Sequence, residues 1–330
     1  MNEVVENEVV KNEVVENEVV KNEVIENEVN DTDVGDAEVN TNKLNGNEND
    51  DDRLMEVKLG VVGGANAGKS SLIGVLSYNI LDDGNGFARN KILKLPHERT
   101  SGATSSISNH HIKIPDQAGF FSLLDLAGHE KYLRTTLHGL SGYSLDYVII
   151  IVGANMGVSR MTKEHLSIIL PLRIPFIVVV TKIDIAPPDI LKKTLEDTEY
   201  IIRKKRSPQR NTIMVETPAD IEEALTYFHQ KNYKYCPIFQ VSNTTGKNLN
   251  LLKQFVFSLK SRHDKTIHYL PENQDKIVFK IYEKFNVKGV GLVISGCLKY
   301  GRIKVGTKLF LGPIQGDWKE ITVKSIHGNF

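Results

Sequence analysis

The sequence predicts an α/β protein with a mostly parallel, doubly wound sheet, a partial β-barrel after it and a disordered tail before it. Short apolar runs typical of buried strands alternate with helical patterns between residues 57 and 261. Past Pro271 the pattern changes to short strands with glycine at the turns. The first 30 residues are a polar tandem repeat.

The predicted tail, residues 1–52, is repetitive and acidic. Its five-residue period between Asn2 and Asn30 matches neither the helical period of about 3.6 nor the strand period of about 2, so no continuous apolar face forms. The tail holds 17 acidic residues and three lysines, a net charge of −14, and the remaining chain carries +14. We predict a disordered, solubilising tail. The open alternative is that it competes with a polyanion such as RNA for the basic body.

The predicted α/β domain spans residues 53–268. An apolar strand over 57–62 leads through a glycine loop into a helix over 69–76. A polar stretch over 82–106 follows and is interpreted as a mobile loop. Further strands are expected at 111–114, 120–126, 147–152, 176–180 and 238–241, and helices at 162–170, 189–204, 220–230 and 249–261. The first two of these strands form a hairpin, and the others are buried.

The predicted barrel domain spans residues 269–330. Its strands are expected at 277–282, 291–294, 308–311 and 321–325. About 60 residues are few for a closed barrel, so we predict an incomplete one.

The composition excludes several classes of protein. Two cysteines, Cys236 and Cys297, cannot build a disulfide framework or a zinc site of their own. The acidic start lacks the basic and apolar regions of a secretion signal. The longest apolar runs are far shorter than the roughly 20 residues that span a bilayer. We expect a cytoplasmic protein with no membrane partner.

A phosphate-binding loop is predicted between the first strand and the first helix. Its sequence, GGANAGKS over residues 63–70, has the spacing of a P-loop. Glycines let successive backbone N–H groups surround the phosphates, and the helix N-terminus adds positive potential. We expect Lys69 to reach the β- and γ-phosphates and the Ser70 hydroxyl to bind Mg²⁺. The expected phosphate contacts are Gly63, Asn66, Ala67, Gly68, Lys69, Ser70 and Ser71.

A second motif selects guanine over adenine. Thr181, Lys182 and Asp184 follow an apolar strand, and the Asp184 carboxylate can accept both donors on one edge of guanine. Adenine lacks that pair of donors and would leave the carboxylate unmatched. The Lys182 stem can lie over the base. Ser242, whose backbone can donate to the guanine oxygen, and Asn243 complete the predicted base site.

A third motif completes the phosphate end. Asp125, at the end of a strand, is expected to hold Mg²⁺ through water, and the Gly128 N–H to sense the γ-phosphate. Thr104 is a candidate for a second hydroxyl on Mg²⁺. By spacing alone, three other hydroxyl residues compete with it, namely Thr100, Ser101 and Ser105.

As an ordered set, these motifs resemble the translational GTPases of the elongation-factor-Tu kind, and among them the branch called GTP-binding proteins one and two. The resemblance covers about residues 55–330 and includes DLAGHEKYLRTTLHGLSG (125–142), VVVTKIDIAPPDILKKTLE (178–196) and FNVKGVGLVISG (285–296). It implies that Thr104 is the Mg²⁺-binding threonine of the switch loop. It also implies that His129 is the catalytic histidine, acting with Lys69 and Thr104. From the residues alone, His129 reads as an exposed loop histidine.

The resemblance implies a GTPase that converts GTP to GDP, with hydrolysis stimulated by docking on the ribosome or on translated RNA. The alternative is a GTP-dependent switch that recruits RNA-decay partners with little turnover. No DNA partner is expected. A basic run, residues 203–206 with Arg210, is interpreted as a solvated loop rather than an RNA contact.

Two features depart from the family pattern. Asn66 stands where the family usually has Asp, and Asn there resembles K⁺-dependent GTPases, so K⁺ near Asn66 is a hypothesis beside simple drift. Relatives complete the barrel and add a third domain. The resemblance therefore implies a fragment or a shortened form, which puts binding of aminoacyl-tRNA in doubt.

Overall fold

The fold is described from a computed structural model. It describes residues 55–93, 98, 104, 107–113, 119–204, 210–230, 233–262 and 277–327. The predicted tail (1–52), both predicted domain boundaries and most of the predicted loop between 94 and 106 lie outside the described residues, as do residues 205 and 206 of the basic run.

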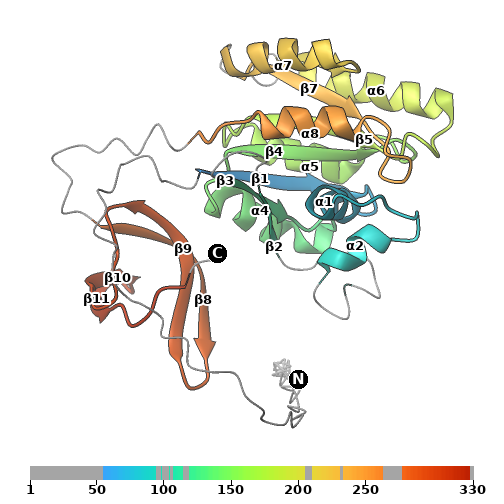
Figure 1. The fold of residues 1–330 in the computed structure, drawn as a ribbon. Helices are drawn as coiled ribbons and strands as arrows, with labels where there is room; N and C mark the ends of the chain where they lie inside the picture. The colour runs from blue at the N-terminus through green and yellow to red at the C-terminus, as the bar shows by residue number, and fades with distance from the viewer. Residues whose placement is uncertain are drawn as a thin grey trace, which may run out of the picture. The chain divides into compact units, whose positions relative to one another are not determined.

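A seven-stranded sheet forms the frame of the first part, with strand order β2-β3-β1-β4-β5-β7-β6 (Figure 1). The strands are β1 (Met55–Gly63), β2 (Ser108–Lys113), β3 (Gly119–Asp125), β4 (Tyr147–Gly153), β5 (Phe176–Thr181), β6 (Asn211–Val215) and β7 (Tyr235–Gln240). All neighbours pair in parallel except β2, which lies antiparallel to β3. The predicted mostly parallel sheet and the predicted hairpin are confirmed.

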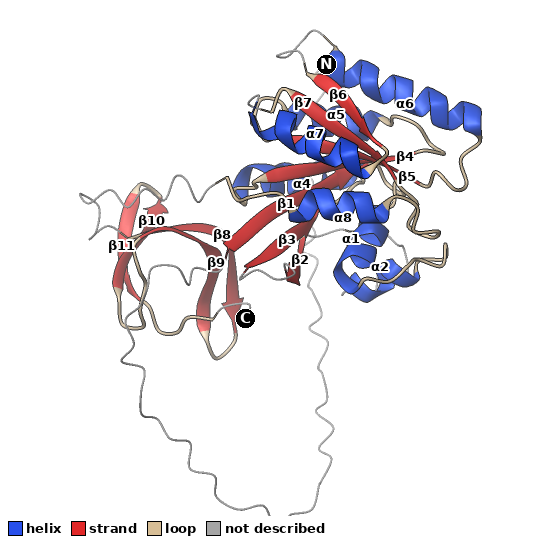
Figure 2. Cartoon of the chain, turned by 45° about the horizontal axis from the view of Figure 1, so that its top comes forward, coloured by secondary structure: helices blue, strands red, loops and turns tan. Residues whose placement is uncertain are grey.

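Helices cover both faces of this sheet (Figure 2). They are α1 (Lys69–Tyr78), α2 (Phe87–Ile92), α4 (Leu133–Gly142), α5 (Arg160–Ile169), α6 (Pro188–Arg203), α7 (Pro218–Gln230) and α8 (Leu249–Phe257), with a 3-10 turn, η1 (Glu130–Tyr132). Alternate residues of each strand point to opposite faces, and this separates the core into two clusters. On β4, Ile149 and Ile151 pack with α1, α7 and α8, whereas Val148, Ile150 and Val152 pack with α4, α5 and α6.

Four elements differ from the sequence prediction. Helix α2 lies in the stretch that was expected to be a mobile loop; the Asp83 carboxylate accepts the Phe87 N–H at 3.0 Å and stabilises its first turn. Helix α4 and strand β6 were not predicted, because α4 has only three buried residues and β6, at the sheet edge, is mostly half-exposed. Helix α8 ends at Phe257, four residues earlier than expected.

Asp146, just before β4, forms hydrogen bonds with β1 and with the segment after α8. Its carboxylate is 1% exposed and accepts the Lys58 N–H at 2.8 Å, the Ser261 hydroxyl at 3.1 Å and the Arg262 N–H. One buried side chain therefore ties β1 and the segment after α8 to β4.

Two antiparallel hairpins follow in the region where an incomplete barrel was predicted. One pairs β8 (Val278–Val287) with β9 (Gly291–Tyr300), and the other pairs β10 (Lys308–Ile314) with β11 (Asp317–Thr322). In the described residues, no helix is long and apolar enough to cross a membrane.

Candidate functional site

The predicted P-loop joins β1 to α1 and folds back on itself. The Ala67 N–H donates to the Gly64 carbonyl at 3.3 Å, which makes the turn tight. Asn66 and Gly68 have positive φ angles of 58° and 90°, a region that asparagine and glycine tolerate best. Gly68 then caps α1, so the loop presents the helix N-terminus at the site.

Lys69 and Asp125 are the two buried charges of the site. Burial lowers the pKa of Lys69, and the negative charge of Asp125 partly opposes this. Burial likewise raises the pKa of Asp125, opposed by Lys69 and by the hydroxyls of Ser70 and Thr104. The Lys69 Nζ also donates to the Gly64 carbonyl at 3.0 Å. A bound phosphate would favour the charged form of Lys69, and a bound cation the charged form of Asp125.

The residues expected at Mg²⁺ come together around one oxygen. Ser70 Oγ donates to Asp125 Oδ2 at 2.7 Å, and Thr104 Oγ1 donates to the same oxygen at 3.0 Å. The two hydroxyl oxygens lie 3.0 Å apart. The second carboxylate oxygen, Asp125 Oδ1, is buried and has no hydrogen-bond partner among the described residues. An all-oxygen set with an unsatisfied carboxylate fits Mg²⁺.

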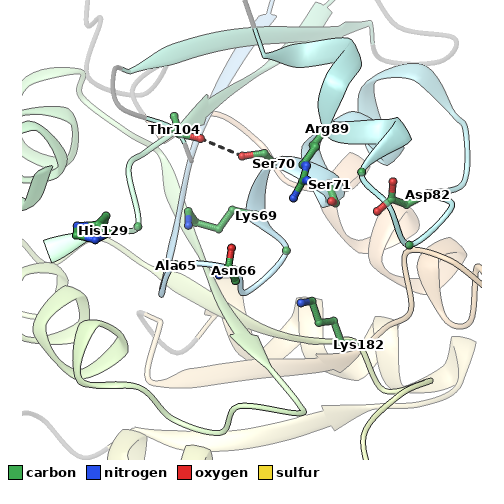
Figure 3. Close-up of a pocket in the computed structure, with 14 residues that line it drawn as sticks. Ala65, Asn66, Lys69, Ser70, Ser71, Asp82, Arg89, Thr104, His129 and Lys182 are labelled. Carbon is green, nitrogen blue, oxygen red and sulfur yellow. Dashed lines mark hydrogen bonds between the residues drawn. The ribbon is translucent and has the colours of Figure 1, made fainter. Parts of the chain in front are cut away.

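Gly128 and His129 lie at the same end of the site. A Cβ on Gly128 would lie 2.6 Å from the Gly63 carbonyl oxygen and would overlap the Lys69 amine, so only glycine fits there. His129 is exposed and lines the pocket (Figure 3). Its Nδ1 accepts the Lys131 N–H at 3.2 Å, which leaves the proton of the neutral ring on Nε2.

The guanine motif is tied to the P-loop at the end of β5. Thr181 Oγ1 donates to the Ala67 carbonyl at 2.6 Å. Asp184 accepts a hydrogen bond from Thr244 Oγ1 at 2.9 Å. Burial disfavours the charge of Asp184, but hydrogen bonds from Ser242 and Thr244 outweigh it, and its pKa lies below its ordinary value.

The Ser242 backbone differs from the sequence prediction. Its N–H donates to the Lys247 carbonyl at 3.1 Å, so it is already engaged. The next N–H along the chain, that of Asn243, is the better candidate for the guanine oxygen. Asn243 is also 7% exposed, and its side-chain Oδ1 has no hydrogen-bond partner among the described residues.

One pocket gathers many of the predicted residues: Asn66, Gly68, Lys69, Ser70, Ser71, Thr104, Gly128, His129 and Lys182. The other predicted residues are not part of its lining: Gly63, Ala67, Asp125, Thr181, Asp184, Ser242 and Asn243. Sequence reasoning missed Asp82, Gly84, Gly86 and Arg89 in the lining. Paired acidic residues just before a glycine and a short basic segment were the signal that could have indicated them. It also missed Thr244, which follows Ser242 and Asn243 in the same motif and donates a hydrogen bond to Asp184.

A family model described as the elongation factor Tu GTP-binding domain matches residues 55–261. The chain belongs to this family. The match covers the whole seven-stranded sheet and the pocket, so the predicted family is confirmed and this GTPase domain is a translation-factor-like one. A domain of this family implies binding of GTP and GDP, typically with Mg²⁺.

Two curated relatives support the same family. "GTP-binding protein 1" of Xenopus laevis is 39% identical over 301 residues, which cover 84% of this chain and 45% of the relative. "GTP-binding protein 2" of Homo sapiens is 32% identical over 305 residues, covering 85% of this chain and 49% of the relative. The chain thus spans about half the length of these relatives.

A solved structure agrees with the fold. Translation elongation factor SelB from Methanococcus maripaludis, in complex with the GTP analogue GppNHp, superposes with a TM-score of 0.52 at 22% identity. The superposition covers 77% of this chain and 44% of the SelB chain.

Proposed function

We propose that this GTPase domain binds GTP with Mg²⁺ and hydrolyses it to GDP, and that docking on the ribosome or on translated RNA stimulates the hydrolysis. One observation carries the proposal: Ser70, Thr104 and Asp125 meet within hydrogen-bond distance, and Ser70 and Thr104 line the same pocket as Lys69, Gly128 and His129. Phosphoryl transfer needs mainly positioning and charge stabilisation, and this arrangement supplies both.

At the phosphate end, the P-loop N–H groups and the Lys69 amine hold the β- and γ-phosphates. Ser70, Thr104 and Asp125 would hold Mg²⁺, which supplies charge neutralisation between the phosphates when bound. The Gly128 N–H faces the γ-phosphate and reports its presence to the segment that follows. Since that segment continues into η1 and α4, the state of the nucleotide is passed to an exposed surface.

The His129 ring orients the attacking water in this proposal. Its hydrogen bond to the Lys131 N–H holds it at the rim of the pocket. Docking breaks that local contact and turns the ring toward the γ-phosphate, where Nε2–H or the lone pair of Nδ1 can position water. Hydrolysis is then slow until a partner is bound.

At the base end, Asp184 accepts the two donors of guanine and the Lys182 stem covers the ring. The Thr244 hydroxyl fixes the carboxylate in position before the base arrives. This order of events lowers the cost of binding, because the carboxylate loses little freedom when guanine binds.

Multiple-turnover GTP hydrolysis, measured with and without ribosomes, tests the proposal. We expect ribosomes to stimulate GTP hydrolysis by the wild-type chain. The ribosome-stimulated rate should be at least about a hundredfold lower in His129→Ala. His138→Ala is the matched control, because His138 is also exposed and lies on α4 outside the pocket. Stimulation that survives His129→Ala would refute the assigned role, and GTP binding without any stimulation would favour the switch alternative.

A polyanionic partner agrees with the charge of the chain after residue 52, which is +14. Two curated relatives are named selenocysteine-specific elongation factors, from Haemophilus influenzae and Methanocaldococcus jannaschii. We therefore propose a ribosomal or RNA partner and a cytoplasmic location. Retention of a purified chain on ribosome pellets, lost at high salt, would support this partner.

We propose in addition that K⁺ raises turnover through Asn66. Asn66 lines the pocket and is exposed, so its amide oxygen can reach a cation beside the phosphates. Its positive φ of 58° offers a second reason for asparagine, because asparagine tolerates this conformation. Asn66→Gly keeps the backbone conformation and removes the amide. We expect faster turnover in K⁺ than in Na⁺ for the wild type and equal rates for Asn66→Gly; equal rates in the wild type would refute the hypothesis.

A further inference from the structure

An arginine lies on the wall of the nucleotide pocket, outside every motif named above. Arg89, on α2, lines the pocket together with Ser70, Ser71 and Gly86. In Figure 3 its side chain reaches from α2 toward Ser71. The predicted P-loop and guanine motifs do not include Arg89, and the proposed mechanism assigns it no role.

The segment before α2 is held in place by three carboxylate and backbone contacts. The Asp82 N–H donates to the carbonyl of Asn243, in the guanine-binding region, at 2.9 Å. Asp82 Oδ1 accepts the Ala88 N–H at 2.9 Å. Asp83 Oδ1 accepts the Phe87 N–H at 3.0 Å. These contacts fix the start of α2 relative to the base site. Arg89 therefore lies on a helix whose position is held by hydrogen bonds.

Close packing also fixes the arginine. Gly74 of α1 meets the backbone of α2, since a Cβ there would lie 2.7 Å from the Ala88 carbonyl carbon. The Arg89 guanidinium lies over Gly86, where a Cβ would come 2.7 Å from its Cζ. The absence of a side chain at Gly86 leaves room for the guanidinium against the loop. Glycines at both positions therefore allow Arg89 to reach the pocket wall.

The Arg89 guanidinium has an unsatisfied hydrogen-bond donor in the part of the chain that the structure describes. Arg89 Nε is buried and has no hydrogen-bond partner among the described residues, and none of the ion pairs found there involves Arg89. A guanidinium remains charged at all relevant pH values, and a buried donor without a partner is costly. Such a group at the wall of a nucleotide pocket fits an anion, and its planar fork matches the oxygens of a phosphate.

The position of Arg89 indicates which of the three phosphates it can contact. His129, Gly128 and the Lys69 amine mark the γ-phosphate end. In Figure 3, Lys69 and Ser70 lie between His129 and Arg89, so Arg89 is on the side of the pocket away from that end. It lies beside Ser71, the residue after the Mg²⁺-binding serine.

We propose that Arg89 binds the α-phosphate of guanine nucleotides and is a further anchoring point for the nucleotide. The inference rests on the proposed function, since it assumes that this pocket holds GTP and GDP. The α-phosphate is common to both nucleotides. Arg89 therefore contributes equally to the GDP-bound and GTP-bound forms, unlike a residue that stabilises the leaving or transferred phosphate.

Nucleotide titration with Arg89→Gln, Arg89→Lys and a matched control tests this. Lys91→Gln removes a positive charge from the same helix but outside the pocket lining. For Arg89→Gln we expect the affinities for GDP and for GppNHp to fall by the same factor, about tenfold to a hundredfold, as for loss of a charge-assisted hydrogen bond. The affinities of Arg89→Lys should lie between those of the wild type and those of Arg89→Gln. The affinities of Lys91→Gln should stay within about twofold of the wild type.

A sulfur-substituted nucleotide locates the contact. GDP carrying sulfur in place of one non-bridging α-phosphate oxygen should bind the wild type more weakly than GDP, for one of its two diastereomers. In Arg89→Gln this difference should shrink, because the partner of that oxygen is gone. Helical circular dichroism of each variant shows that it is folded, and Arg89→Lys provides the measurement if Arg89→Gln does not fold.

Three outcomes would overturn the inference. Unchanged GDP affinity in both Arg89 variants would show that the guanidinium makes no contact with the bound nucleotide. A selective loss of GppNHp affinity or of hydrolysis, with GDP affinity retained, would place Arg89 at the γ-phosphate instead. Failure of the wild type to bind any guanine nucleotide would refute the proposed function itself, and the inference with it.

Discussion

Acidification should destabilise the GTPase domain through one buried histidine. His165 lies on the inner face of α5, is fully buried, and both of its ring nitrogens lack a hydrogen-bond partner among the described residues. Burial, with the nearby positive charge of Lys69, lowers the pKa of His165 from its ordinary 6.5 to about 4. The neutral ring is thus the form that the folded protein accommodates.

The sign and size of the effect follow from this pKa. Between pH 4 and 6.5 the unfolded chain binds a proton that the folded chain refuses, so the free energy of unfolding rises with pH in that window. The difference between 6.5 and about 4 corresponds to about 3 kcal/mol at about 1.36 kcal/mol for each pKa unit. This stability is fully present above pH 6.5 and is lost as the pH falls toward 4.

Urea unfolding of the wild type and of His165→Leu, followed by far-ultraviolet circular dichroism, measures the effect. Every helix in the described part of the chain lies between residues 69 and 257, so the signal reports on the GTPase domain. Leucine fills a similar volume without titrating. Asp125, whose pKa is raised by burial, contributes a slope of opposite sign to both proteins and cancels in their difference.

We expect the stability of the wild type relative to His165→Leu to fall by about 3 kcal/mol between pH 7 and pH 4. A difference that stays constant over this range would refute the reasoning, because it would mean that His165 titrates normally in the folded protein.

Three further substitutions have defined outcomes. Gly128→Ala places a methyl group against the Lys69 amine and removes room beside the γ-phosphate, so GppNHp affinity should fall at least about tenfold in a titration. GDP affinity should fall by a smaller factor, because Lys69 also holds the β-phosphate; unchanged GppNHp affinity would contradict this. Asp184→Asn should weaken GDP binding about a hundredfold and improve binding of xanthosine diphosphate in a competition assay, because the amide donates where the carboxylate accepted. Asp146→Ala leaves two backbone N–H groups without their acceptor and should lower the urea stability by about 3 kcal/mol, a loss under about 1 kcal/mol being contrary to the argument.

The parts of the fold that the sequence predicted are those with strong local patterns. Runs such as 147–152 and 176–180 are too apolar to be anything but buried strands, and both lie at the centre of the sheet. Helix α2 escaped prediction because it depends on side chains that cap its first turn, Asp82 and Asp83, rather than on an apolar stripe. Strand β6 escaped because an edge strand is only half-buried and shows weak alternation.

The same distinction holds for the candidate site. Motif residues such as Lys69 and Asp184 can be predicted because each chemical role fixes both a residue type and a spacing. Arg89 and Thr244 cannot, since their relevance arises from tertiary contacts with the pocket and with Asp184. Tertiary contacts can also remove a predicted role. The Ser242 N–H was expected to be available to guanine, but the folded turn brings it to the Lys247 carbonyl, which accepts its hydrogen bond.

The hydrogen bond between Thr181 and the Ala67 carbonyl has a consequence for nucleotide exchange. It joins the end of β5, where the guanine motif begins, to the P-loop, and the Asp82–Asn243 contact joins the segment before α2 to the loop after β7. The end of β5 is therefore linked directly to the loop that is expected to hold the phosphates. We expect a displacement on the base side alone to disturb the phosphate-binding loop and so to accelerate the release of GDP.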